Sequence, residues 1–119
     1  MSDISALNGK TICNVTGLRK GSKIVVFTCA DGSVFEMQHH QDCCEDVWLE
    51  DLDGCAQDII GGYVVDAYES TKCARDNKYD ENGTWTFYTI NTDRGSVWLR
   101  WLGVSNGYYS ESVSFDQVA

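Results

Sequence analysis

The sequence predicts a mainly β fold, or an α+β fold with one or two short helices, built as one domain over residues 1–119. Several segments alternate apolar and polar residues with a period of two, which sends successive side chains to opposite faces of a strand. Turn pairs such as Asp31-Gly32 separate these segments, and no segment of normal helix length shows a 3.6-residue period. These observations favour a single antiparallel twisted sheet or a small barrel-like roll.

The chain opens with a polar lead-in over residues 1–9. Residues 10–16 then alternate as a first strand. Because neighbouring side chains of a strand point to opposite faces, we expect Cys13 and Val15 on one face and Ile12 on the other.

Residues 23–29 and 33–39 predict a β-hairpin. Both segments alternate, and the Asp31-Gly32 pair that joins them is a strong short-range turn signal. The first segment is rich in β-branched and aromatic residues, which suit a pleated strand. In the second segment Phe35 and Met37 share one face, opposite Val34, Glu36 and Gln38.

Residues 45–52 predict a strand with one heavily charged face, because Val47 and Leu49 alternate with acidic residues. Residues 36–58 contain eight carboxylates and no Lys or Arg. We therefore expect an acidic β-edge that is free for a partner. The acids of this predicted face are Asp42, Glu45, Asp46, Glu50, Asp51 and Asp53.

The second half is predicted to be a meander of strands. Residues 53–62 would hold a helix of about two turns with Asp53 as its cap. Residues 63–70 predict a strand, and the polar residues 71–83 predict a mobile loop. Three further alternating strands are expected at residues 84–91, 96–103 and 108–115.

The formal net charge of −9 argues against a protein that wraps nucleic acid, since phosphate contacts need a basic face. It suits binding to a basic protein surface. The first residues lack the basic region and apolar core of a signal peptide, and no apolar run is long enough to span a membrane. We expect a cytoplasmic protein whose six cysteines stay mostly reduced.

Soft metal ligands gather in one short stretch, and zinc prefers four such ligands in a tetrahedron. The usual Cys-x-x-Cys spacing is missing, and adjacent side chains of an extended chain point to opposite faces. The alternative is that His40 caps a turn while Cys43 and Cys44 pack as small apolar groups. The candidate metal ligands are His39, His40, Cys43 and Cys44, with Cys55 and Cys73 available to complete a set.

Other chemistry fits this stretch poorly. Aligning Asp51, Asp53 and Gly54 on a calcium-binding EF-hand loop puts Leu49 at the first ligand position and Ile60 at the last, so the motif fails.

A nucleophilic cysteine needs electropositive surroundings, whereas Cys43 and Cys44 lie among acids. A carboxylate pair such as Glu45 with Glu50 is better explained as a solvated acidic face. We therefore expect no enzyme activity, no catalytic residues and no cofactor.

A second candidate site lies among the aromatic residues of the last third. Trp98, Arg100 and Leu102 should share one strand face, opposite Val97, Leu99 and Trp101. An arginine beside aromatic rings can stack a base and hold a phosphate. Alternatively both faces are covered, and Arg100 merely pairs with an acid such as Glu111. The candidate ligand-binding residues are Trp98, Arg100, Tyr108, Tyr109 and Ser110.

Four segments carry a resemblance to a known family: HHQDCCEDVWLEDL, TWTFYTI, GSVWLRWLG and SNGYYSESVSF. The most specific parts are the Asp-Cys-Cys-Glu core at residues 42–45 and the Asn-Gly-Tyr-Tyr-Ser-Glu-Ser segment at residues 106–112. The chain resembles a family of small phage and bacterial domains of unknown function, over nearly its whole length. The resemblance implies a phage or prophage setting and brings no catalytic residues.

Three functional hypotheses follow. The first is a phage-type counter-defence protein that inhibits a host protein with a basic surface through the acidic face, in the host cytoplasm. The second is a binding module that sequesters a nucleotide-like signalling molecule in the aromatic and arginine pocket. The third is a small metal-binding domain. No direct contact with nucleic acid or membrane is expected, and a homo-oligomer is left open.

Overall fold

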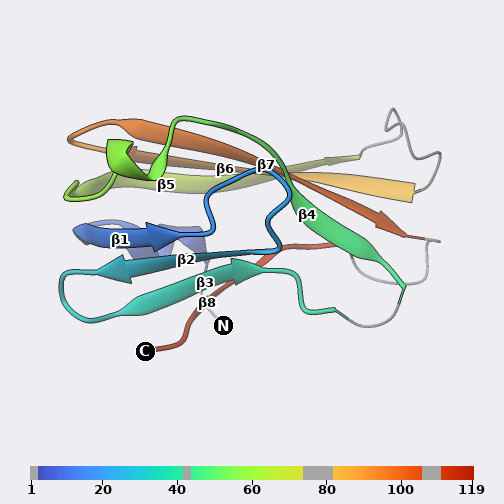
Figure 1. The fold of residues 1–119 in the computed structure, drawn as a ribbon, viewed down its shortest axis with the longest axis horizontal. Coiled ribbons are helices and arrows are strands. Elements are labelled where there is room, and N and C mark those ends of the chain that lie inside the picture. The colour runs from blue at the N-terminus through green and yellow to red at the C-terminus, as the bar shows by residue number, and fades with distance from the viewer. Residues whose placement is uncertain (1–2, 42–43, 74–81, 106–110) are drawn as a thin grey trace.

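The computed structural model describes residues 3–41, 44–73, 82–105 and 111–119. Within these residues the chain forms strands and two short 3-10 helices, arranged as two antiparallel sheets (Figure 1). The mainly β prediction is confirmed, but the strands form two sheets rather than a single sheet or a barrel-like roll. The elements are η1 (Ile4–Leu7), β1 (Ile12–Thr16), β2 (Ile24–Cys29), β3 (Val34–Gln38), β4 (Asp46–Asp53), η2 (Ala56–Asp58), β5 (Val64–Cys73), β6 (Asn82–Thr92), β7 (Ser96–Ser105) and β8 (Ser114–Gln117).

The two sheets differ in length. The short sheet has the order β1-β2-β3-β8, and its strands run for 4 to 6 residues. The long sheet has the order β4-β7-β6-β5, and its strands run for 8 to 11 residues. Figure 1 shows the long sheet projecting past the end of the short one. Part of the inner face of the long sheet therefore has no sheet opposite it.

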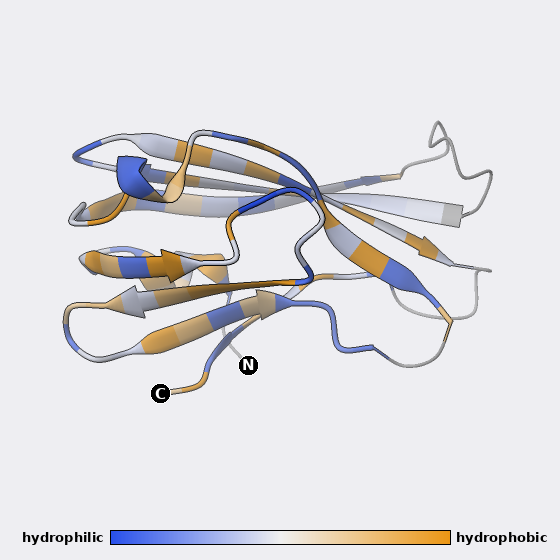
Figure 2. Ribbon diagram, viewed as in Figure 1, coloured by the Kyte–Doolittle hydropathy of each residue, from blue (hydrophilic) through white to orange (hydrophobic). Residues whose placement is uncertain are grey.

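One apolar core fills the space between the sheets. Phe27, Phe35 and Met37 enter it from the short sheet, and Leu99 and Trp101 enter from the long sheet, all fully buried. Hydrophobic and hydrophilic residues alternate along the strands (Figure 2), as one buried face requires. The indole Nε1 of Trp101 donates a hydrogen bond to Met37 Sδ at 3.3 Å, so a polar group that is buried in the core has a partner.

The predicted hairpin is confirmed, since β2 pairs with β3 in antiparallel register and Phe27 lies opposite Phe35. The predicted three-strand meander is wrong in its last strand. Strands β6 and β7 pair, but β8 crosses to the short sheet and pairs with β3. There Phe115 stacks on Phe35 with ring centroids 5.2 Å apart, so burial of the ring stabilises the crossing.

The first strand departs from the expected alternation. A register shift between Ile12 and Asn14 places Ile12 and Val15 in the core and leaves Cys13 exposed. An extra residue in one strand resets the period of two, which explains the wrong prediction for this strand. The lead-in is not simply polar either, because helix η1 buries Ile4 and Leu7.

Two further predictions need correction. The helix expected at residues 53–62 is only the three-residue η2, with Cys55 rather than Asp53 as its N-cap. The loop expected at residues 71–83 is shorter, because β5 extends to Cys73 and β6 begins at Asn82, while residues 74–81 lie outside the described residues. In the described part of the chain, no helix has the length and apolar character needed to cross a membrane.

Candidate functional site

Strand β4 is an edge strand, as predicted, with Val47 and Leu49 buried against the core. Two of its acids, however, form ion pairs with lysines of the same chain at the surface. Asp46 pairs with Lys23 at 2.9 Å, and Asp51 pairs with Lys20 at 3.3 Å. The charge that the sequence places on this face is therefore partly neutralised by the turn before β2.

Glu45 does not belong to an exposed face, because its side chain is fully buried beside His39. Nε2 of His39 lies 2.7 Å from Oε2 of Glu45, and Nδ1 lies 2.6 Å from the carbonyl oxygen of Ser112. Both ring nitrogens thus lie within hydrogen-bond distance of an oxygen atom. Gln41 donates to the backbone oxygen of Glu45 at 2.6 Å. The pair ties the end of β3 to the segments before β4 and β8.

The remaining residues of the acidic and metal predictions have other surroundings, and Cys44 forms a disulfide bond. His40 Nε2 lies 2.9 Å from Asp116 Oδ2 on the exposed side of the short sheet. Asp53 is exposed at the end of β4. Asp42 and Cys43 lie outside the described residues. Among the residues that the structure describes, no three His, Cys, Asp or Glu side chains gather as a set of metal ligands.

The outer face of the long sheet carries the predicted aromatic and arginine cluster. Val97, Leu99 and Trp101 share one face, as expected, and the structure shows that this face is the core side, so Trp98 and Arg100 point outward. We call this outer cluster the aromatic face. It comprises the half-exposed residues Trp48, Trp85, Phe87, Trp98 and Arg100, above the buried Leu102 and Val104.

Arg100 lies at the centre of the aromatic face. Its guanidinium carbon is 4.6 Å from the ring centroid of Trp85 and 5.8 Å from that of Trp98. Phe87 and Trp98 extend the array, with centroids 5.9 Å apart. Such contacts combine cation–π attraction with apolar packing.

The partner of Arg100 is Glu50. Nε and Nη2 of Arg100 donate to Glu50 Oε2 at 3.0 and 2.6 Å. Glu111, which was expected as an alternative partner, instead accepts hydrogen bonds from Thr84 and Ser105. Tyr108, Tyr109 and Ser110 lie outside the described residues, so the predicted pocket is described only at Trp98 and Arg100.

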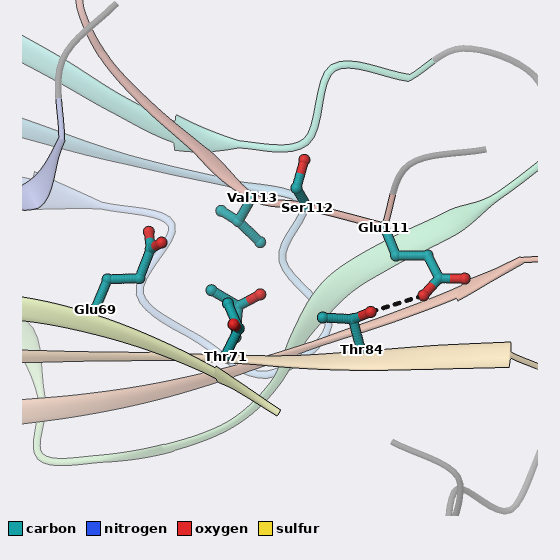
Figure 3. A pocket seen from close by; sticks show the side chains of 7 residues that line it. Glu69, Thr71, Thr84, Glu111, Ser112 and Val113 are labelled. Carbon is teal, nitrogen blue, oxygen red and sulfur yellow. Dashed lines mark hydrogen bonds between the residues drawn. The ribbon is translucent and has the colours of Figure 1, made fainter. Parts of the chain in front are cut away.

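A cleft that the sequence reasoning missed lies on the inner face of the long sheet, with a volume of about 260 Å³. Glu69 and Thr71 on β5 line it, together with Thr84 and Thr86 on β6 (Figure 3). The segment that carries Glu111 and Val113 forms the opposite wall. In the sequence, the cleft corresponds to polar residues at alternate positions of two strands. Such residues predict a cleft only when the face of the sheet that points inward is known.

Comparison with known proteins identifies one family. The family model described as Domain of unknown function (DUF7448) matches residues 5–115, so the chain belongs to that family. No curated protein and no solved structure matches the chain.

Proposed function

We propose that this member of the DUF7448 family is a non-enzymatic binding protein whose aromatic face contacts a partner protein. The observation that carries the proposal is the cluster of the partly buried Trp48, Trp85 and Trp98, of which Trp85 and Trp98 lie against the guanidinium of Arg100. Large contiguous apolar patches on a protein surface mark interaction sites. Trp and Arg are also the residues most enriched among those that dominate binding energy at protein interfaces.

The acids of β4 would form the rim of this interface. Asp53 is exposed beside the aromatic face, and Asp46 and Asp51 are paired with flexible lysines at the surface. Rim charges act mainly on the association rate and on the choice of partner. With a net charge of −9, the chain suits a partner that surrounds an apolar patch with basic residues.

In the phage setting that the sequence resemblance implies, the partner would be a host protein, and binding would inhibit it as a counter-defence measure. The chain would thus act as an acidic inhibitor, as the sequence predicts. The indoles of the aromatic face, rather than the carboxylates of β4, would make the central contact with the host protein.

The test compares matched variants of the purified chain. A partner captured from a bacterial lysate is identified by mass spectrometry, purified, and titrated against each variant. Trp98→Ala should weaken binding at least tenfold. Val65→Ala, which trims a 62% exposed apolar side chain on β5 that is not part of the aromatic face, should not. Equal affinity of the Trp98 variant and the native chain would overturn the proposal.

A second measurement separates the rim from the centre. Neutralising Asp46, Asp51 and Asp53 together should slow association and flatten its salt dependence, because exposed charges are screened by salt. It should leave the dissociation rate less affected than Trp98→Ala does. If the triple variant abolishes binding while Trp98→Ala is silent, the acidic face is the contact centre after all.

A nucleotide-like ligand is the second candidate, favoured by the stacking of Arg100 on Trp85. A phosphate would have to displace Glu50 from the guanidinium, since two of its donors are already used. Under this hypothesis Glu50→Gln should strengthen binding of AMP, ADP or a cyclic dinucleotide, and Arg100→Gln should abolish it. Thermal stabilisation by these probes measures both changes. No stabilisation of either the native chain or the Glu50 variant would exclude these probes as ligands.

A further inference from the structure

We propose that the cleft on the inner face of the long sheet binds an alkylammonium or guanidinium group, from a lysine or arginine side chain or a free amine. The cleft lies on the opposite face of the sheet from the aromatic face, so this inference stands independently of the proposed function. The cleft has a volume of about 260 Å³, and two glutamates are among the residues that line it.

Two glutamates line the cleft from opposite sides, with the carboxylate of Glu111 turned toward Thr84 (Figure 3). Glu69 projects from β5 and Glu111 from the opposite wall, with the threonine side chains of β5 and β6 between them (Figure 3). Among the described residues neither glutamate forms an ion pair, whereas Asp31, Asp46 and Glu50 each do. The cleft is therefore a negatively charged hollow, and none of the described residues that line it is a Lys or Arg.

Hydrogen bonds hold the lining in place. Thr84 Oγ1 donates to Glu111 at 2.8 Å, and the Ser105 hydroxyl donates to the other carboxylate oxygen. Deeper in the same face, the hydroxyl of the fully buried Tyr88 lies 3.4 Å from the carbonyl oxygen of Val113. Burial, and then its hydrogen bond to Glu69, raise the pKa of Tyr88, so this phenol stays neutral. A preorganised lining of this kind reduces the ordering cost of binding.

Size and chemistry select the ligand class. A volume of about 260 Å³ lies just below the roughly 300–1,000 Å³ of pockets that hold drug-sized ligands, so a single side-chain-sized group fits better than a nucleotide. The two carboxylates repel phosphates. They also fall short of the ligand set of a divalent metal, in line with the lack of any such set among the described residues. The side chain of Val113 and the threonine methyl groups suit the alkyl part of an organic cation.

The probe for the test is agmatine, which carries a guanidinium and an ammonium group on a short alkyl chain. Titration followed by backbone amide NMR should give saturable shifts at Thr71, Thr84, Thr86 and Val113. Butyramide, which has a similar alkyl part without the charge, should give none. Shifts from agmatine scattered over the whole acidic surface would overturn the proposal, since they indicate general charge attraction.

Matched variants separate the cleft from the overall charge. Glu69→Gln and Glu111→Gln should each weaken agmatine binding at least fivefold. Asp66→Asn removes the same charge from an exposed position on β5 outside the cleft, and should change affinity less than twofold. Glu69 is exposed and its variant keeps the Thr84 contact intact, so the test survives if the Glu111 variant is unstable. Equal weakening by Asp66→Asn and Glu69→Gln would refute the proposal.

A final arm distinguishes the two sources of the cation. The probe is the peptide Gly-Gly-Arg-Gly-Gly with both ends blocked. If it binds the native chain at least tenfold more tightly than agmatine and loses affinity with Glu69→Gln, the cleft receives the side chain of a protein partner. If agmatine binds more tightly and the peptide does not compete, the cleft takes a free amine. Failure of both probes to bind would overturn the inference without touching the proposal for the aromatic face.

Discussion

His39 and Glu45 form a buried pair, with Nε2 and Oε2 2.7 Å apart and side-chain exposures of 6% and 0%. The pair joins the segment that follows β3 to the segment that precedes β4, and through Ser112 it also reaches the segment before β8. Its role is thus to hold three segments of chain together at the end of the short sheet.

Removing Glu45 should therefore cost stability out of proportion to its single charge. Glu45→Ala leaves the imidazole buried without its acceptor, and breaking a buried pair typically costs roughly 3–5 kcal/mol. His40→Ala removes a histidine that is 64% exposed in its own pair with Asp116, and should cost about 0–1 kcal/mol. Urea denaturation of both variants measures the two free energies of unfolding. Similar losses in the two variants would contradict a structural role for the His39–Glu45 pair.

Gly17 should be far less replaceable than Gly21, although both have positive φ angles of 81° and 88°. A Cβ at Gly17 would lie 2.2 Å from the backbone oxygen of Ile24, whereas nothing lies within 4 Å of a Cβ at Gly21. Gly21→Ala should cost roughly 1–2 kcal/mol from the left-handed backbone alone. Gly17→Ala should cost roughly 1–3 kcal/mol more, because the turn must shift to relieve the overlap. Thermal unfolding of the two alanine variants compares them directly.

The four free cysteines among the described residues should react at two distinct rates. Cys13, Cys55 and Cys73 are exposed, whereas Cys29 is 2% exposed and its burial raises the pKa of the thiol. Because the thiolate is the nucleophile, both effects slow alkylation of Cys29. Pulse labelling with iodoacetamide and peptide mass spectrometry should find Cys29 unmodified until the chain is unfolded. Labelling of Cys29 as fast as Cys13 would show that β2 opens readily.

Acid should destabilise the fold partly through Asp31. Hydrogen bonds from Lys10 and Ser33 lower the pKa of Asp31 below its ordinary value in the folded chain. The unfolded chain therefore binds a proton more readily, so this contribution is present above about pH 4 and is lost as the pH falls through the folded value. Asp31→Asn should be less stable at pH 7 and should lose less stability on acidification. Denaturation midpoints from pH 7 to pH 2 test this, with the exposed Asp53→Asn as the charge-matched control.

Much of the fold was predictable because its signals are local. The hairpin of β2 and β3 follows from two alternating segments and one Asp-Gly turn, and the burial of Val47 and Leu49 follows from alternation alone. Alternation also places Trp98 and Arg100 on one face of β7, and the structure shows that this face points outward. The bulge at β1 and the crossing of β8 were missed, because strand pairing joins residues that are distant in sequence.

The candidate sites were less predictable for a related reason. Residue type indicates charge and reactivity, but the availability of a side chain depends on its neighbours in space. The pairing of Arg100 with Glu50 spans fifty positions in the sequence, and the contact of His39 with Ser112 spans more. The cleft between Glu69 and Glu111 arises from three separate segments and leaves no local pattern.

The sequence by itself determined the mainly β class, which residues share a face of β3, β4 and β7, and the net charge of −9, because these depend on residue types and on a period of two. Only the tertiary structure decided which charges are available. It buries Glu45 beside His39, pairs Glu50 with Arg100, and leaves Glu69 and Glu111 facing a cleft. The physical reason is that burial and ion pairing are properties of contacts between distant segments, and those contacts form only when the two sheets pack together.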